Sequence, residues 1–470
     1  MSKRAVTAGL AAAVGIALVA SCSSSGGSDN TTKSGGNSSG KTITVWSEEN
    51  DADRVAATQA IAARFTAATG VKVKLVGIDE NQFQQLVTSD AAAGKLPDVI
   101  GALPLAAVQY LASNDLVDTK ANQAAVDALG KETFDANAVS LTQYKGAQAA
   151  VPSDAWVQLL LYRKDLFQKA GLAAPETFEG IQAAAAKLNS GGTAGITMAT
   201  VPNDAFTEQS FEYFALANGC QMVDDSGKVT LDSSACVTAF RTYADLVRND
   251  SVRGNQDVDT TRATYFAGKA AMVVWSSFIL DELAGLRKDA LPTCPQCKSE
   301  PTFLSKNTGV VTAIKGPDGS KPVQFGEIGS WTITKDGKNT SESQKFVQYM
   351  LNEGYPGWLG LSPEGKFPVR TGTAQDKQKF VTAWSGLKTG VDTKAALSQF
   401  YPASVLDLLR NSPQQIARWA LPQGQGQLLG ATLGPLPVPK AVNAAVNGLD
   451  AQKAAGQAQS AVEKIQSSLK

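Results

Sequence analysis

The stretch TITVWSEENDADRVAATQAIAARFTAATGVKVKLVGI, residues 42–78, decides the fold class. Its first five residues are β-branched or aromatic, as in a buried strand, and four polar residues end that strand. A helix is expected next, because Ala57, Ile61 and Phe65 share one helical face and Gly70 can end it. The last eight residues again have the pattern of a strand. The stretch therefore predicts a β-α-β unit.

The same alternation continues along the chain. Residues 80–93 and 105–113 have helical periodicity, and residues 98–101 between them are typical of a short strand. This order favours a parallel sheet with helices on both faces. A second series starts after Val151-Pro152. Its predicted strands are 159–162, 195–200 and 270–275, and its predicted helices are 164–170, 205–218, 233–250 and 260–268. The strand predicted at 329–334 and the helix at 341–351 resemble the first series again, and residues 373–470 are predicted to be helical, with an amphipathic helix over 451–469.

The composition excludes several kinds of site. The 470 residues include no histidine, so a Ser-His-Asp triad, a Cys-His pair and a histidine-ligated metal are impossible. The 43 Lys and Arg residues balance 43 Asp and Glu residues, so the chain lacks the excess of positive charge that is typical of nucleic-acid-binding proteins. No phosphate-cradling glycine loop is present, and we expect no cofactor and no metal. A binding protein or a carboxylate-based enzyme remains.

The N-terminus has the pattern of an export signal. Lys3 and Arg4 precede the uncharged run Ala5–Ala20, whose 16 residues fall short of the roughly 20 that a membrane-spanning helix needs. The following Ser21-Cys22 makes the end of this run resemble a bacterial lipobox, which implies that residues 1–21 are removed and Cys22 is lipidated. Residues 22–41 lack large apolar side chains, so we expect a flexible tether and an extracytoplasmic, membrane-anchored body.

Four further cysteines favour two disulfides in an oxidising compartment. Cys220 and Cys236 flank a predicted hairpin turn, and a bridge could close that hairpin. Cys294 and Cys297 could close a small loop of their own. A redox-active pair or half of a zinc site is the alternative for this second pair, but the surrounding sequence lacks a thioredoxin-like βαβ pattern.

Six segments of the chain resemble one protein family. They are ITVW (43–46), FTAATGVKVKL (65–75), GKLPDVI (94–100), LLLYRKDLFQKAGL (159–172, followed by APETFEG), YFAGKAAMVVW (265–275) and IGSWTITKDGKNTSESQKFVQYML (328–351). In this order they resemble the extracellular solute-binding proteins of bacterial ABC importers, in the carbohydrate-binding group that includes maltodextrin-binding proteins.

The resemblance implies an α/β fold of the two-lobe, periplasmic-binding-protein-like class II, with hinge segments and a ligand cleft between the lobes. Lobe 1 would comprise residues 42–150 plus 316–372, and lobe 2 residues 151–315 plus 373–470. The protein would be a monomer that captures a sugar or oligosaccharide by lobe closure and delivers it to the membrane permease of an ABC transporter. It would not be an enzyme.

Sugars present apolar faces edged by hydroxyl groups, so their sites combine aromatic rings with carboxylates or amides. In doubly wound sheets such residues lie just after strands. Residues of these types follow the predicted strands and the proline at position 152, where the resemblance also implies ligand contacts. The predicted ligand-binding residues are Trp46, Glu48, Glu49, Asn50, Asp154, Trp156, Trp275, Ser276, Glu327 and Trp331.

Three alternatives remain at this stage. A carboxylate-based glycoside hydrolase could use two among Glu48, Glu49 and Asp154 as acid and nucleophile. The same fold could bind a non-sugar solute such as a glycerophosphodiester, which would need a cluster of cations in the cleft. A purely adhesive surface lipoprotein is the third alternative, but such a protein would not need acidic and aromatic residues at the ends of its strands.

Overall fold

The predicted β-α-β start is present in the computed structural model, which describes residues 41–469. Strand β1 (Thr42–Ser47) pairs in parallel with β2 (Lys72–Gly77) and with β3 (Val99–Leu103). Helix α1 (Ala52–Thr69) connects β1 to β2 and packs its apolar face, including fully buried Phe65, on the sheet. The predicted signal peptide, the lipidation site Cys22 and most of the tether lie outside the described residues.

The sheet is mixed, and its order is β10-β6-β9-β3-β1-β2. Strand β9 (Gln324–Ile333) lies antiparallel to β3 on one side and to β6 (Val151–Arg163) on the other. The short β10 (Phe367–Pro368) forms the far edge. The predicted parallel pairing is confirmed for β1, β2 and β3, whereas β9 and β6 add antiparallel pairs, because the chain returns to this sheet from the opposite direction at β9.

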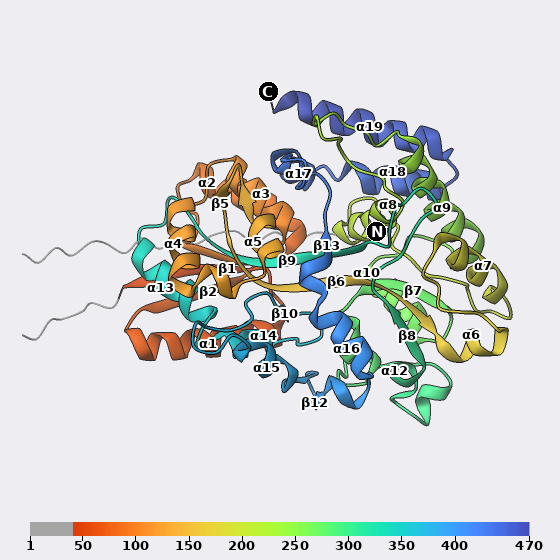
Figure 1. The fold of residues 1–470 in the computed structure, drawn as a ribbon, viewed down its shortest axis with the longest axis horizontal. Coiled ribbons are helices and arrows are strands. Elements are labelled where there is room, and N and C mark those ends of the chain that lie inside the picture. Colours follow the sequence, from red (N-terminus) through yellow and green to blue (C-terminus); the bar gives the residue numbers. More distant parts are fainter. Residues whose placement is uncertain (1–40, 470) are drawn as a thin grey trace, which may run out of the picture. The chain divides into compact units, whose positions relative to one another are not determined.

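Strand β6 joins two halves of the molecule (Figure 1). Residues 151–157 pair with β9, whereas residues 158–163 pair with β7 (Met272–Ser276) and β8 (Thr308–Val311). The strand predicted at 159–162 is thus the second half of a much longer one. A continuously buried strand has no period that would mark where it begins.

Helices surround both halves, and their order follows the predicted alternation. In the first half, the helices are α2 (Phe83–Ala92), α3 (Leu105–Ser113), α4 (Thr119–Leu129), α5 (Ala136–Leu141), α13 (Thr340–Met350) and α14 (Tyr355–Leu359). In the second, they are α6 (Lys164–Ala170), α7 (Phe178–Leu188), α8 (Ala205–Ala217), α9 (Ser234–Asp250), α10 (Val258–Phe266), α11 (Ile279–Leu283) and α12 (Phe303–Asn307).

The strand predicted at 195–200 is not formed. Only two isolated parallel bridges occur there, Ala194 to Ala270 and Thr197 to Val273. The backbone N–H groups of this segment donate to three separate partners, since Ile196 bonds to the carbonyl of Asp250 while its neighbours bond elsewhere. Ala194 and Thr197 both bond to residues 269–274, but Ile196 between them bonds elsewhere, so the unbroken series of bonds that a ladder needs is interrupted.

The C-terminal part is largely helical, as predicted, and packs on both halves. Residues 373–411 pack on α14 and β10, where the Trp384 indole donates to the carbonyl of Pro363 at 2.9 Å. The last helices pack with α8 and α9 around a second apolar core. These C-terminal elements are α15 (Lys379–Ser385), α16 (Ala403–Arg410), β13 (Ile416–Ala417), α17 (Gly426–Thr432), α18 (Pro437–Val446) and α19 (Ala451–Ser468).

Both disulfides are present, Cys220–Cys236 and Cys294–Cys297. The predicted turn between the first pair also forms, because the Asp224 carboxylate accepts from the backbone N–H groups of Ser226 and Lys228. Within residues 41–469, no helix combines the length and apolar character needed to cross a bilayer.

Candidate functional site

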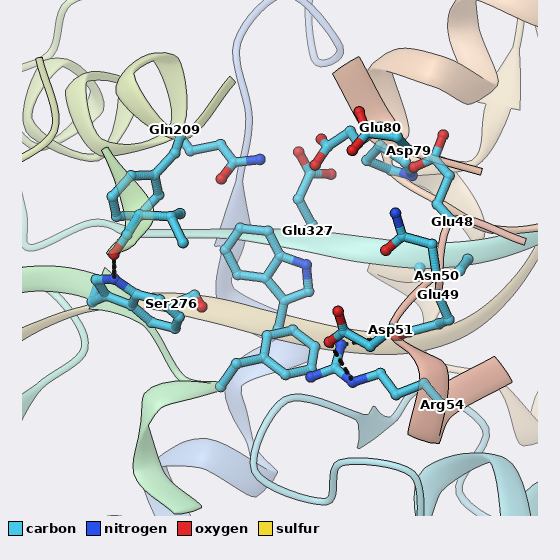
Figure 2. A pocket seen from close by; sticks show the side chains of 18 of the residues that line it. Glu48, Glu49, Asn50, Asp51, Arg54, Asp79, Glu80, Gln209, Ser276 and Glu327 are labelled. Atoms are coloured by element: carbon cyan, nitrogen blue, oxygen red, sulfur yellow. Dashed lines mark hydrogen bonds and ion pairs between the residues drawn. The ribbon is translucent and has the colours of Figure 1, made fainter. Parts of the chain in front are cut away.

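A cavity of about 770 Å³ lies where the two halves meet. One wall is formed by the residues that follow β1 and β2, and the opposite wall by the N-terminal ends of α8 and α10 and the end of β7. Figure 2 shows Gln209 and Ser276 on one side, facing Glu48, Asp79 and Glu80 on the other. Strands β6 and β9 pass through the floor, so the pocket lies directly over the strands that join the halves.

Eight of the ten predicted ligand contacts line this pocket, and two do not. The eight are Glu48, Glu49, Asn50, Asp154, Trp156, Trp275, Ser276 and Glu327. They come from four separate segments of the chain. Choosing residues that follow strands or the proline therefore selected side chains that are distant in sequence but line one pocket. Whether each one contacts solute remains a prediction.

Trp46 and Trp331 are core residues instead. Trp331 is fully buried, with its ring centroid 4.9 Å from that of Trp358, and its indole fills the space left by Gly101. Trp46 is 8% exposed and packs with Ile78. Both lie on strands whose two faces are covered, so their rings pack in the core and do not line the pocket.

Aromatic side chains are concentrated on the floor and on the wall of the second half. Trp156 is partly buried, with its ring 6.4 Å from that of Phe278. Trp275 is only 6% exposed, and its Nε1 donates to the carbonyl of Val258 at 3.1 Å. Its ring lies 5.9 Å from that of Phe206. Trp156 therefore presents more of its face to a solute than Trp275 does.

Glu49 and Asp154 share one buried cation. Lys366, 2% exposed, bonds to Glu49 Oε1 and lies 3.3 Å from Asp154 Oδ2. Asp154 also accepts from Trp358 Nε1 at 2.5 Å, and Glu49 accepts from Arg54 at 2.8 Å. Burial disfavours the ionised form of Glu49, but the charges of Lys366 and Arg54 outweigh burial and lower its pKa to about 2.

Glu327 belongs to a second buried network beneath the pocket. Its Oε1 pairs with Arg418, which also donates to Glu212 of α8 at 3.0 Å. Its Oε2 accepts from the backbone N–H of Leu105, the first residue of α3, where a carboxylate is favoured by the helix dipole. This network therefore connects β9, α3 and α8, and it leaves Glu327 with little capacity for a solute.

Glu48 differs from these because no cation pairs with it among the described residues. Its Oε1 is buried without a hydrogen-bond partner. Burial, followed by the charges of Glu80, Glu49 and Asp79, raises the pKa of Glu48 well above its ordinary value of 4.5.

Sequence reasoning missed many of the lining residues. Asp79 and Glu80 directly follow β2, so the rule that selected Glu48 would also have selected them. Asp204 and Asp257 cap the N-termini of α8 and α10, positions that normally indicate only helix starts. Lys366 precedes a two-residue strand and carries no signal in the sequence.

A two-part α/β fold, joined by shared strands and holding a large polar and aromatic pocket over them, defines the two-lobe solute-binding class. A family model described as bacterial extracellular solute-binding protein matches residues 60–389, so the chain belongs to that family. The predicted fold class and the predicted role in solute binding are confirmed.

Relatives and solved structures agree with this assignment. The Escherichia coli K12 protein YcjN, named for an ABC transporter periplasmic-binding protein, is 29% identical over 325 residues, covering 67% of this chain and 70% of YcjN. A maltooligosaccharide ABC transporter solute-binding lipoprotein of Streptococcus pneumoniae is 26% identical, covering 67% of this chain and 69% of its own. Maltose-bound MalE3 of T. maritima has a similar fold, with a TM-score of 0.68, 18% identity and coverage of 90% and 99%.

Proposed function

We propose that this protein captures a sugar or oligosaccharide in the pocket and delivers it to the membrane permease of an ABC transporter. The observation that supports this most is the lining itself, which combines aromatic rings with carboxylate and amide oxygens in a cavity of about 770 Å³. Aromatic rings pack on the apolar faces of sugars, while the oxygens accept hydrogen bonds from hydroxyl groups. Relatives and structural neighbours named for maltose and maltooligosaccharides support the same solute class.

The mechanism follows from the position of the pocket over the joining strands. A solute that contacts both walls binds the closed arrangement better than the open one and so shifts the population toward closure. The hinge would lie in β6 near Val157, where its partner changes from β9 to β7 and β8. The permease would recognise the closed form. The lobe boundaries stated from the sequence stay a prediction, and a hinge near Val157 would assign residues 151–157 to lobe 1.

We further place the protein outside the cytoplasmic membrane as a monomer, held there by a lipid on Cys22. The family description names extracellular proteins, and the Streptococcus pneumoniae relatives are named lipoproteins. A two-chain lipid anchor would keep the folded body at the membrane surface near its permease. Mass spectrometry of the purified protein, with a lipid mass on the peptide that starts at Cys22, tests this placement.

Two of the alternatives conflict with the charges of the pocket. A hydrolase needs two carboxyl groups, one as acid and one as nucleophile or base. Glu49 and Asp154 are both held by Lys366, so only Glu48 of the three candidates is unpaired. A phosphodiester needs free cations, yet all four basic residues of the lining are paired with carboxylates. These residues are Arg54, Arg262, Arg287 and Lys366. We therefore infer binding without hydrolysis.

Thermal unfolding tests the proposal directly. The protein starting at Lys41, which retains the compact unit, would be heated with a panel of mono- and oligosaccharides. A sugar that binds only the folded state stabilises it by about 2.7 kcal/mol at a hundredfold excess over its Kd, so we expect a raised midpoint with one group of sugars. An unchanged midpoint across neutral and charged sugars alike would contradict the proposal.

Replacing Trp156 by alanine is expected to weaken sugar binding about tenfold or more. Truncating an aromatic side chain at the centre of a binding site costs about 2 kcal/mol, and Trp156 lies on the floor between the walls. Titration calorimetry measures the change. Trp156→Phe retains an aromatic face and should recover part of the affinity, whereas equal losses in both variants would show that stacking is not the role of this residue.

A further inference from the structure

The pocket contains many more carboxylates than it can neutralise. Twelve acidic and four basic residues line it, and all four basic residues are already paired. Five of the acidic residues have no cationic partner among the described residues. They are Glu48, Asp79, Glu80, Asp204 and Asp257. The chain as a whole has equal numbers of acidic and basic residues, so this excess is a local property of the pocket.

These five carboxylates lie on both walls. Glu48, Asp79 and Glu80 come from the wall that follows β1 and β2 (Figure 2), whereas Asp204 and Asp257 come from the N-terminal ends of α8 and α10. The walls influence each other electrostatically. Desolvation, followed by the charges of Asp204 and Asp79, raises the pKa of Glu80 to about 7. Carboxyl groups therefore face each other across the pocket, and above about pH 7, where Glu80 is ionised, their repulsion disfavours closure of the empty pocket.

An independent observation also indicates a missing donor. Glu282 lines the pocket and is 6% exposed, and its Oε1 accepts from Arg262 at 3.0 Å. Its Oε2 is buried and has no hydrogen-bond partner among the described residues, which is also true of Glu48 Oε1. Buried carboxylate oxygens without donors are costly, so other donors of the solute, such as its hydroxyl groups, would stabilise these two oxygens where they reach them.

We propose that the solute is a cationic sugar, whose ammonium group lies between Glu80 of one wall and Asp204 of the other. The inference rests on the proposed function and narrows its substrate class. An ammonium offers three donors and no acceptor, which matches a lining of carboxylate oxygens, whereas a neutral hydroxyl does not offset their charge. A metal ion fits less well, because no group of three or more potential ligands with suitable geometry occurs within residues 41–469.

The charge also provides a way to link binding to closure. An ammonium between the walls converts their repulsion into two attractions, so it favours the closed arrangement more than a neutral sugar of equal size does. Because these contacts are charged, the affinity should fall as salt is added. It should also fall as the pH drops below about 7, since Glu80 then takes up a proton while Asp79, Glu48 and Asp204 surround it.

Probes that differ in charge test this proposal. The β-1,4-linked disaccharide of glucosamine, its N-acetylated form and cellobiose share one ring skeleton, but only the first is cationic. Titration calorimetry near neutral pH should give an affinity at least about tenfold higher for the glucosamine disaccharide. Glucosamine and glucose form a second pair. Equal or tighter binding of the neutral member of every pair would overturn the cationic inference and leave sugar binding intact. Binding of none of these sugars would overturn both.

Matched variants locate the ammonium. Glu80→Gln and Asp204→Asn each remove one charge, and asparagine can still cap α8 as Asp204 does. Each should reduce the preference for the amine-bearing sugar over cellobiose by about tenfold. Glu176→Gln is the control, because Glu176 is exposed, lies outside the pocket lining and should leave the preference unchanged. An equal preference in all three variants would place the charge elsewhere and overturn the assigned position.

Discussion

Replacing Arg418 by methionine is expected to lower the free energy of unfolding by about 3–5 kcal/mol, the typical cost of removing one partner from a buried ion pair. Arg418 is 5% exposed and lies between Glu212 and Glu327, which are both buried. Without its guanidinium, two carboxylates of like charge would remain in a dry environment. Urea denaturation at neutral pH measures the loss.

An exposed pair provides the control for this prediction. Arg410 pairs with Asp407 at the surface, and Arg410→Met should change stability by no more than about 1 kcal/mol. Adding Glu212→Gln and Glu327→Gln to Arg418→Met should restore part of the loss, because the buried charges are then gone. A loss for Arg418→Met as small as that for Arg410→Met would show that the network contributes little to stability.

This network also explains why Glu327 was a plausible but incomplete prediction. The sequence shows that a carboxylate lies near the end of a strand returning to the sheet, which is where solutes bind. It does not show that Arg418, 91 residues later, reaches the same carboxylate. Contacts between distant segments are set by tertiary packing, and no local pattern around residue 418 indicates one. The position of Glu327 could be predicted, but the residue that pairs with its carboxylate could not.

The fold was predictable where local patterns and packing agree. The series from β1 to α3 has regular periodicity with residues that end each element, and the structure follows it closely. The prediction failed for residues 195–200, where an apolar run resembles a strand but its backbone bonds to several partners. It also missed the length of β6, since a strand buried on both faces has no alternation to mark its ends.

The pocket residues show the same limit. Trp156, selected because it follows Pro152, and Trp275, selected at a strand end, both line the pocket, whereas Trp331 fills the space over Gly101. Whether a tryptophan on a strand faces a pocket or a core depends on what covers that face. Covering elements come from other parts of the chain, so the sequence around a tryptophan cannot decide between the two.

Replacing Lys366 by methionine is expected to destabilise the protein by about 3–5 kcal/mol at neutral pH, with a distinctive dependence on pH. In the wild type the pKa of Glu49 is about 2, below its ordinary value of 4.5. The fold therefore favours ionised Glu49, and this contribution is complete above about pH 4.5 and is lost as the pH falls toward 2. Without Lys366, burial acts on Glu49 with only Arg54 opposing it, and the pKa of Glu49 should rise.

The difference in stability between wild type and Lys366→Met should consequently be largest at neutral pH and shrink as the pH falls from 5 toward 3. The wild type loses its stabilising charge pair over that range, while the variant gains because a buried carboxylate takes up a proton. Lys335→Met, which breaks the exposed pair with Asp115, is the matched control and should show a small, nearly constant difference. A large difference for Lys366→Met that stays constant from pH 7 to 3 would assign the loss to packing over Trp358, whose ring lies 4.1 Å from the Lys366 ammonium, rather than to charge.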